Sequence, residues 1–480
     1  MEKNQTNIDV THINPIAKYF LTLISMFQTN IRDYGMYIAL IAIFIIFSIM
    51  TGGIFMAPIN FTNLLNQTAY VSVLAVGMTL VIVTRQIDLS VGYIGAFLGS
   101  FVVVYVENKG VPVIAALFGA LLITIAVGFV KGWFVAKIKV PAFVVTLAGM
   151  FIFKGFLMLQ TNNRTIPTTN KFFRAIGIGY LKEFQVFGIS ISIPLVIGVI
   201  LVGLVLFMGI RNRKKNTLLN IPNEKTSLFI TKQIVLLLVI VFLTYTFQVY
   251  KGISWLLLIT VAVVAIYHFM TTRTTLGRRI YAVGGNPDAA ELSGISVERI
   301  LIIVFISMGI MALISGVMYV SRLQNTSPNH GPFWELYAIA AAFIGGTSAS
   351  GGVGKVVNAV IGSLAIMSLK NGMALAGVDA NIEPIILGSV LLLAVVFDIF
   401  TRNVRPIDYV GIHIAHRVYK DEYQKALAEL HEATNALAEA KSVEDGDFIE
   451  FEYALTNAQG NFNKIKDKIR VSKEEDFLDV

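Results

Sequence analysis

The sequence predicts an all-α, polytopic membrane protein with about twelve apolar segments and a helical extension after them. Three observations support this class. Hydrophobic residues make up 55% of the 480 residues and charged residues only 14%, whereas soluble domains contain about a quarter charged residues. Apolar runs of roughly 20 residues, long enough to cross about 30 Å of hydrocarbon as a helix, recur along most of the chain. The shorter segments of alternating hydrophobicity that a transmembrane β-barrel requires are absent from the sequence.

The apolar segments follow a polar N-terminal part, which we place over residues 1–34. Its apolar stretch, residues 20–27, is too short to span and is not followed by a small-residue cleavage site. We therefore expect an interfacial or cytoplasmic helix there rather than a signal peptide. The tenth apolar segment is short for a full crossing, and a re-entrant path is the alternative. The twelve segments lie near residues 36–57, 66–84, 88–107, 111–135, 143–160, 191–210, 232–249, 253–270, 300–320, 335–347, 352–375 and 383–401.

Basic residues divide the connections between these segments into two sides. Cytoplasmic loops of membrane proteins carry the excess of Lys and Arg, so basic loops here indicate sidedness and no nucleic-acid partner is expected. Even numbers of apolar segments separate the basic connections, which predicts a multi-pass protein of the cell membrane with both termini cytoplasmic. The polar connections 161–190 and 321–334 then face outside. The basic connections are the N-terminal part, residues 131–139, 211–215, 273–299 and the pair Arg402 and Arg405.

The composition changes after the membrane domain, which we place over residues 35–403. Residues 411–480 contain 9 basic and 15 acidic residues, a net charge of −6, which leaves +14 for the preceding residues because the whole chain carries +8. Within the tail 404–480, residues 421–441 have Ala and Leu at helical spacing, and a second helix-capable stretch follows a break near Gly446. We predict an acidic, cytoplasmic helical tail, with a helical hairpin as one arrangement.

The residue types argue against an enzyme. The chain has no cysteine, which excludes disulfides and cysteine nucleophiles, and its 6 histidines lack metal-ligand spacing. Residues 345–355 resemble a phosphate-binding loop, but Ala349 stands where its first glycine belongs and Val356 replaces the Ser or Thr after the lysine. We expect no catalytic residue, metal or cofactor, and we interpret these glycines as points where helices approach closely or break.

Two places put ionisable residues next to hydrocarbon, where they are costly and commonly face a cavity or one another. In Val83–Gly92, Arg85 and Asp88 lie three positions apart between apolar runs. One interpretation is a broken helix along a solute path, with Asp88 capping a helix that begins near Ser90. The other is a short cytoplasmic turn. Lys154, inside an apolar run, lines the path in one interpretation and snorkels or pairs in the other. The candidates for the translocation path are Arg85, Asp88, Ser90 and Lys154.

Residues 277–300 form a compact polar stretch between two apolar segments. Asn286 suits a helix cap and Pro287 the first helical position, and Gly294 is expected to end the helix. Such a rigid knob on a cytoplasmic loop suits a membrane subunit that receives force from a soluble motor; a merely well-capped loop is the alternative. The expected contact surface, within a loop over residues 271–299, comprises Gly285, Asn286, Pro287, Asp288, Ala289, Ala290, Glu291 and Gly294.

Four motifs in order resemble the permeases of ABC importers for ribose and xylose. Asp288-Ala289-Ala290-x-x-x-Gly294 is similar to their coupling motif, with Asp in place of Glu. The runs "GMTLVIVTRQIDLSVG", "VPAFVVTLAGMFIFKG" and "SRLQNTSPNHGPFWELYAIAAAFIGGTSASGGVG" resemble three further motifs. The resemblance covers about residues 35–403, and xylose-type permeases share a hydrophobic pair like that at 232–270. The chain departs from the family at Arg85-Gln86, where the family usually has Gly-Gly, and at Lys131, where Asn is frequent.

The resemblance implies a permease subunit that forms the path for a monosaccharide, xylose or a related sugar, delivered by an extracytoplasmic sugar-binding protein. It also implies a second permease copy, separate ABC ATPase subunits that hydrolyse ATP, and surrounding membrane lipid. An ion-gradient-driven secondary transporter is the alternative. The tail has no counterpart in the family, and its two interpretations are contact with the ATPase subunits and a solvated extension.

Overall fold

The structure is a computed structural model that describes residues 31–186, 189–219, 226–403, 420–441 and 452–464. Its contacts divide the chain into two units: residues 32–210 with 231–400, which form the helical bundle, and the remainder, which includes the tail. The predicted interfacial helix within residues 1–34 and the break near Gly446 lie outside the described residues, apart from the first residues of α2.

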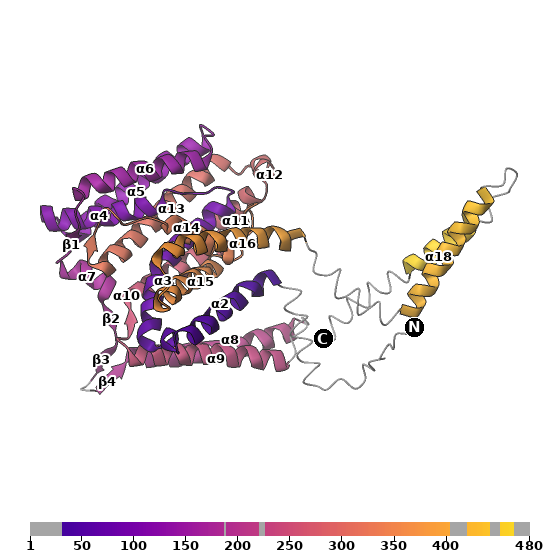
Figure 1. Ribbon diagram of the computed structural model, residues 1–480, viewed down its shortest axis with the longest axis horizontal. Coiled ribbons are helices and arrows are strands. Elements are labelled where there is room, and N and C mark those ends of the chain that lie inside the picture. Colours follow the sequence, from indigo (N-terminus) through magenta and orange to yellow (C-terminus); the bar gives the residue numbers. More distant parts are fainter. Residues whose placement is uncertain (1–30, 187–188, 220–225, 404–419, 442–451, 465–480) are drawn as a thin grey trace. The chain divides into compact units, whose positions relative to one another are not determined.

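The bundle consists almost entirely of helices, as predicted (Figure 1). Its helices up to residue 250, in chain order, are α2 (Ile31–Met50), η2 (Ile54–Met56), α3 (Pro58–Val83), α4 (Val91–Lys109), α5 (Val113–Ala136), α6 (Ala142–Thr161), α7 (Lys171–Ile178), α8 (Ile193–Leu218) and α9 (Thr226–Val249). Those that follow are α10 (Trp255–Arg273), α11 (Thr275–Gly285), α12 (Pro287–Leu292), α13 (Val297–Leu323), α14 (Trp334–Ile344), α15 (Val356–Leu375), η3 (Ala380–Ile382) and α16 (Glu383–Asn403).

Each of the twelve predicted apolar segments contains one of these helices. Within the described residues, nine helices are long and apolar enough to cross a membrane, and three apolar helices are shorter. The second segment starts earlier than predicted, because α3 already begins at Pro58, which occupies a first-turn position where its missing N–H costs nothing. The tenth segment is short, as expected. With 11 residues, α14 spans only about 16 Å, about half of the hydrocarbon thickness.

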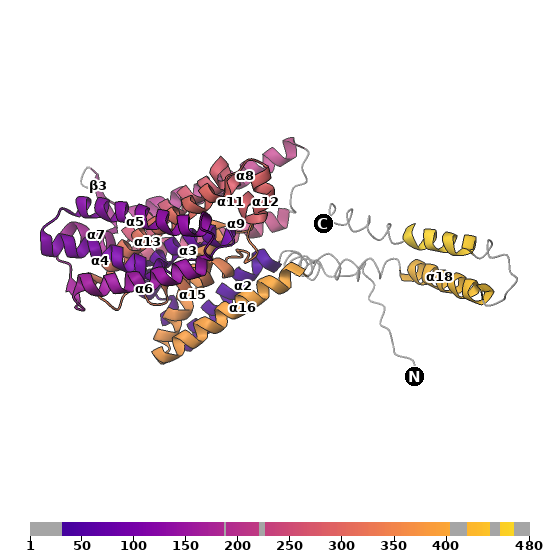
Figure 2. The ribbon, with the colours of Figure 1, turned by 90° about the horizontal axis from the view of Figure 1, so that it is seen from above.

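α3 is the centre of the bundle. Nearly all of its side chains are buried, from Phe61 to Val83, whereas the described residues of α9 are exposed or half-buried except for Thr246. α13, α15, α14 and α10 pack around α3, and α13 also packs along α4 and α5. α8 and α9 lie side by side at the edge of the bundle (Figures 1 and 2), where Gly198 meets Thr244. α4 and α14 both begin next to the core, since Val91 and Trp334 are buried.

Short strands tie together the connections that were predicted to face outside. β1 (Ile166–Pro167) pairs antiparallel with β6 (Asn325–Thr326), so the 161–190 and 321–334 connections meet at one end of the bundle. β2 (Tyr180–Leu181) pairs with β5 (Ile253–Ser254), and β3 (Glu183–Val186) forms a hairpin with β4 (Ile189–Ser192). In Figure 1 these strands lie at the end opposite to α11 and α12.

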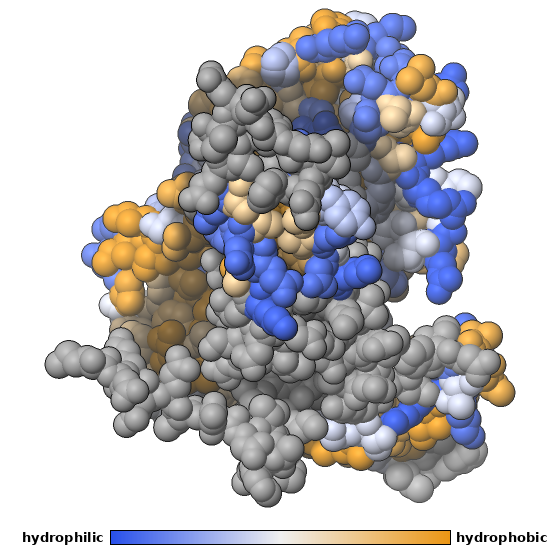
Figure 3. All heavy atoms as spheres, turned by 90° about the vertical axis from the view of Figure 1, so that its right-hand side faces the viewer, coloured by the Kyte–Doolittle hydropathy of each residue, from blue (hydrophilic) through white to orange (hydrophobic). Residues whose placement is uncertain are grey.

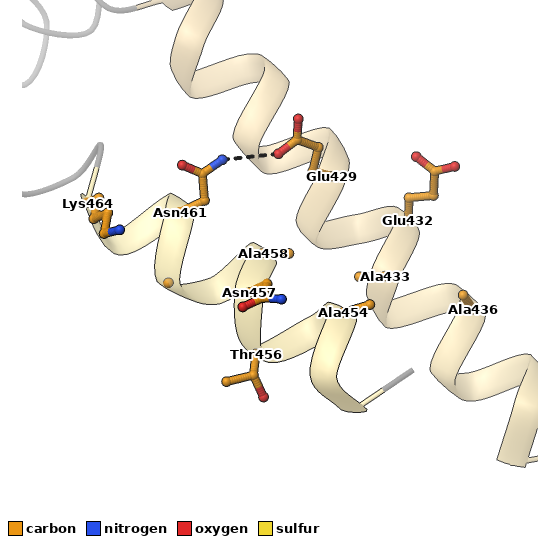
Figure 4. A pocket seen from close by; sticks show the side chains of 11 residues that line it. Glu429, Glu432, Ala433, Ala436, Ala454, Thr456, Asn457, Ala458, Asn461 and Lys464 are labelled. Carbon is orange, nitrogen blue, oxygen red and sulfur yellow. Dashed lines mark hydrogen bonds between the residues drawn. The ribbon is translucent and has the colours of Figure 1, made fainter. Parts of the chain in front are cut away.

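The described part of the tail is a pair of helices. α18 (Lys420–Lys441) matches the predicted amphipathic helix, and a second helix covers residues 452–464. The two lie side by side and face each other across a small pocket (Figure 4), where Asn461 Nδ2 donates to Glu429 Oε2 at 3.2 Å. Alanines of both helices, among them Ala433 and Ala454, line this pocket. The two described helices therefore contact each other, and the hairpin stays a prediction because the residues that join them lie outside the described part of the chain.

Candidate functional site

α12 has the local geometry predicted for the knob between the apolar segments. The Asn286 side chain accepts a hydrogen bond from the backbone N–H three residues on, at 3.0 Å, and Pro287 occupies the first helical turn. Asp288 lies in the same turn, where the helix dipole favours an acid. The chain leaves the helix through Gly294, whose φ of 79° is in the left-handed region that favours glycine. The predicted cap, start and stop are confirmed.

α12 is anchored on one side and exposed on the other. Ala290 is buried, whereas Ala289 and Glu291 are exposed. The Leu292 side chain is 91% exposed, more than any other large hydrophobic residue of the described chain. Seen from the right-hand side of Figure 1, both hydrophilic and hydrophobic residues are exposed at the surface (Figure 3). An exposed leucine at the end of a capped helix offers an apolar contact to a partner protein.

The end of α11 lies directly against the end of α3. A Cβ added at Gly284 would lie 1.8 Å from Val83 O, so this approach requires glycine. Gly352 N donates to the same carbonyl at 2.9 Å, and the Tyr281 hydroxyl donates to Gly354 O at 2.6 Å. The glycine-rich 345–355 loop therefore joins α11 to α3. This agrees with the interpretation that its glycines permit close approach.

A buried ion pair holds the break between α3 and α4. Asp88 is fully buried there, and its Oδ1 accepts hydrogen bonds from Ser90 N at 2.9 Å and Ser90 Oγ at 2.5 Å. Its Oδ2 pairs with Lys131 Nζ at 2.6 Å, and this ammonium also donates to Ser90 Oγ at 3.0 Å. All three groups are more than nine-tenths buried. The geometry favours a helix broken within the protein over a solvent-exposed turn.

Two details differ from the sequence-based expectation. Asp88 does not cap α4, because the N-cap residue is Ser90, and Asp88 bonds to the N–H of Ser90 itself, ahead of the helix. Lys131, counted above with the basic residues of a cytoplasmic connection, instead lies inside α5. It can do so because Asp88 neutralises its charge and Ser90 accepts a hydrogen bond from it.

The other two path candidates have partners of their own. Arg85 is exposed, and its guanidinium donates to Gly284 O, at 2.7 Å, and to Gly285 O. Lys154 is exposed on α6, and its Nζ lies 5.9 Å from the centre of the Tyr93 ring in the first turn of α4. The structure thus brings Asp88 and Ser90 together, and it places Arg85 at the end of α11, directly before α12.

Glu335 and His330 are buried polar groups that the sequence analysis missed. Glu335 is 8% exposed, and its Oε2 has no hydrogen-bond partner in the described part of the chain. A Cβ added at Gly92 would lie 2.6 Å from this oxygen and 2.4 Å from Gly331 O, so the first turns of α4 and α14 meet here. His330 Nδ1 is likewise buried without a partner among these residues. The sequence feature that could have revealed Glu335 is the position of this acidic residue at the start of a short apolar segment.

Aromatic rings surround this meeting point. The Tyr319 ring centre lies 4.4 Å from that of Trp334, 5.0 Å from that of Tyr70 and 5.1 Å from that of His330. Neither α4 nor α14 has a side-chain cap, although Trp334 N donates to Gly331 O at 3.3 Å. Aromatic faces and a carboxylate suit a solute rich in hydroxyls. Three or more His, Asp or Glu residues in metal-binding proximity do not occur in the described residues.

The described residues form a bundle of helices long and apolar enough to span a membrane, in which α4 and the shorter α14 begin beside buried polar groups. This architecture is typical of membrane transport proteins. Residues 60–395 match the family described as the permease component of branched-chain amino acid transport systems, and the chain belongs to this family.

Relatives within this class transport sugars, according to their names. The chain is 38% identical over 376 residues to the xylose transport system permease protein of Escherichia coli (strain K12). The aligned residues cover 78% of this chain and 93% of the relative. It is 37% identical over 371 residues to the corresponding Haemophilus influenzae protein, covering 77% and 97%. It is 34% identical over 361 residues to the ribose import permease protein of Escherichia coli, covering 75% and 92%. No solved structure is significantly similar to the chain.

Proposed function

We propose that the chain is the transmembrane permease subunit of an ATP-driven ABC importer for a monosaccharide, xylose or a related sugar. The observation that carries the proposal is α12, a capped helix with the exposed Leu292, in a chain related to xylose and ribose permeases. ABC ATPase subunits dock on α12 and hydrolyse ATP. The sugar-binding protein docks at the opposite end, where the 161–190 and 321–334 connections meet. This orientation places both termini in the cytoplasm.

The path proposed for the sugar runs past the junction of α4 and α14. Glu335, His330 and the surrounding aromatic rings offer acceptors, donors and apolar faces to a sugar. Asp88 and Ser90 hold the break ahead of α4 in place. A second copy of the permease completes the assembly, and it would cover Lys154, whose exposed charge is costly against lipid.

The direct test is reconstitution into liposomes of the chain with its ATPase and sugar-binding protein. Sugar uptake that requires ATP and both partners supports the proposal. Uptake by the chain alone along an ion gradient would instead identify a secondary transporter. Counter-screening xylose, ribose and an amino acid identifies the substrate class.

Leu292→Asp is expected to lower ATP-dependent uptake at least about tenfold, because a charge would replace the apolar contact at the docking surface. Co-purification of the ATPase with the permease should fall in parallel. Leu218→Asp is the matched control, because Leu218 is 83% exposed and lies on α8. Equal uptake by the wild type and the Leu292 variant would remove α12 from the docking surface.

Truncation after Arg405 is expected to leave ATPase binding and sugar-stimulated hydrolysis within about twofold of the full chain. The reason is that alanines of α18 already face the helix at 452–464, and charge alone acts only over about 8 Å in physiological salt. The measurement is ATPase retention and hydrolysis in the purified complex. Loss of the ATPase on truncation would make the tail an assembly element instead.

A further inference from the structure

Arg85 has a backbone conformation that glycine adopts more readily. Its φ is 63°, in the left-handed region. Arg85 N donates to Ile82 O at 2.8 Å and Gln86 N donates to Val81 O at 3.0 Å, which is the hydrogen-bond pattern that ends a helix through a left-handed residue. An arginine that tolerates a glycine conformation indicates that its side chain has a use.

The side chain of Arg85 binds the end of α11. The last two residues of this helix, Gly284 and Gly285, present carbonyls that have no partner within the helix, and Arg85 donates to both. α11 has no basic residue in its own last turn, so Arg85 supplies the positive charge that a helix C-terminus favours. Asn286, the cap of α12, follows directly.

The same loop is attached at its other end to the interior. Three residues after Arg85, Asp88 is fixed by Lys131 and Ser90, and α4 begins at Val91, directly after Ser90. Gly92 in the first turn of α4 touches the start of α14. A continuous set of contacts therefore leads from α12 through the 84–90 loop to the junction of α4 and α14.

We propose that Arg85 is a positioning residue for transport: it holds α11 and α12 on the 84–90 loop, so that movement of α12 reaches the starts of α4 and α14. The coupling role rests on the proposed function, whereas the attachment of α11 does not. Loss of Arg85 should therefore have two effects that can be measured separately. Locally, α11 and α12 become less ordered; functionally, movement of α12 is less well coupled to transport.

The first test measures hydrogen–deuterium exchange of the full chain in nanodiscs, without partners. Arg85→Gly is expected to raise the amide exchange rate over residues 281–294 about tenfold, because the end of α11 opens more frequently without the hydrogen bonds from Arg85. The exchange rate of Arg85→Lys should lie between those of the wild type and Arg85→Gly, since the donors of a lysine are all on one ammonium group. Lys139→Gly is the matched control: Lys139 is exposed, basic and also left-handed, with φ of 62°. Unchanged exchange in Arg85→Gly overturns the attachment.

The second test measures ATP hydrolysed per sugar imported by the reconstituted complex. Arg85→Gly is expected to raise this ratio at least about fivefold while ATPase binding persists, and Lys139→Gly should leave it unchanged. Faster exchange with a normal ratio would reduce Arg85 to a structural contact and overturn the positioning role. Absence of ATP-dependent uptake in the wild type would contradict the proposed function and with it the coupling role, while the exchange result would still decide the attachment.

Discussion

Lys131→Met is expected to destabilise the protein by about 3–5 kcal/mol, because it leaves the buried Asp88 carboxylate without its cationic partner. Asp88 is fully buried and Lys131 is 5% exposed, so water cannot replace the lost interaction. Asp88→Leu should destabilise the protein by about as much, since it leaves the buried Lys131 ammonium without its anionic partner. The measurement is the thermal midpoint and the monodisperse yield of the purified protein in detergent.

The double variant Asp88→Asn with Lys131→Met is the decisive control. It removes both charges, while asparagine retains an acceptor for Ser90 N, so most of the lost stability should return. Asp88→Asn alone is expected to be milder than Asp88→Leu, for the same reason. If the double variant were as unstable as the sum of the single variants, the two residues would act independently, and the ion pair would not be what holds the break.

The membrane fold was predictable because its signal is local and continuous. A run of about 20 apolar residues specifies a spanning helix wherever it lies, so every predicted segment contains a helix. The cap of α12 was predictable for the same reason: Asn286 bonds to a backbone group three residues away. The start of α3 was missed because residues 58–65 are more polar than a lipid-facing helix, yet the helix is buried among others and needs no lipid-facing surface.

The interior of the site was not predictable in the same way, because its partners are distant in sequence. Asp88 and Lys131 are 43 residues apart, and Arg85 lies 199 residues from Gly284. Each residue could be recognised as unusual in its surroundings, but its partner could not be identified. Glu335 was hidden at the edge of an apolar segment, and its position beside Gly92 depends on how α4 and α14 pack.

Gly316→Val is expected to have the second large effect, because it separates α13 from α4. A Cβ at Gly316 would lie 1.9 Å from Gly95 O, and a backbone atom cannot move aside as a flexible side chain can. The expected cost is about 3 kcal/mol or more. Since α13 follows α12 directly and packs along α4, any protein that still folds should also lose sugar uptake.

Gly203→Val is the matched control for this change. Gly203 lies on α8 with nothing within 4 Å of an added Cβ, so its valine variant should keep the wild-type yield and thermal midpoint. The stability of Gly316→Ala should lie between those of Gly316→Val and Gly203→Val. The single methyl group of alanine already meets Gly95 O, but alanine lacks the branches of valine. The measurement is the monodisperse fraction after extraction, together with the thermal midpoint. Equal behaviour of the two valine variants would show that α13 and α4 can separate without loss, and would contradict the close contact on which the placement of the α4 start depends.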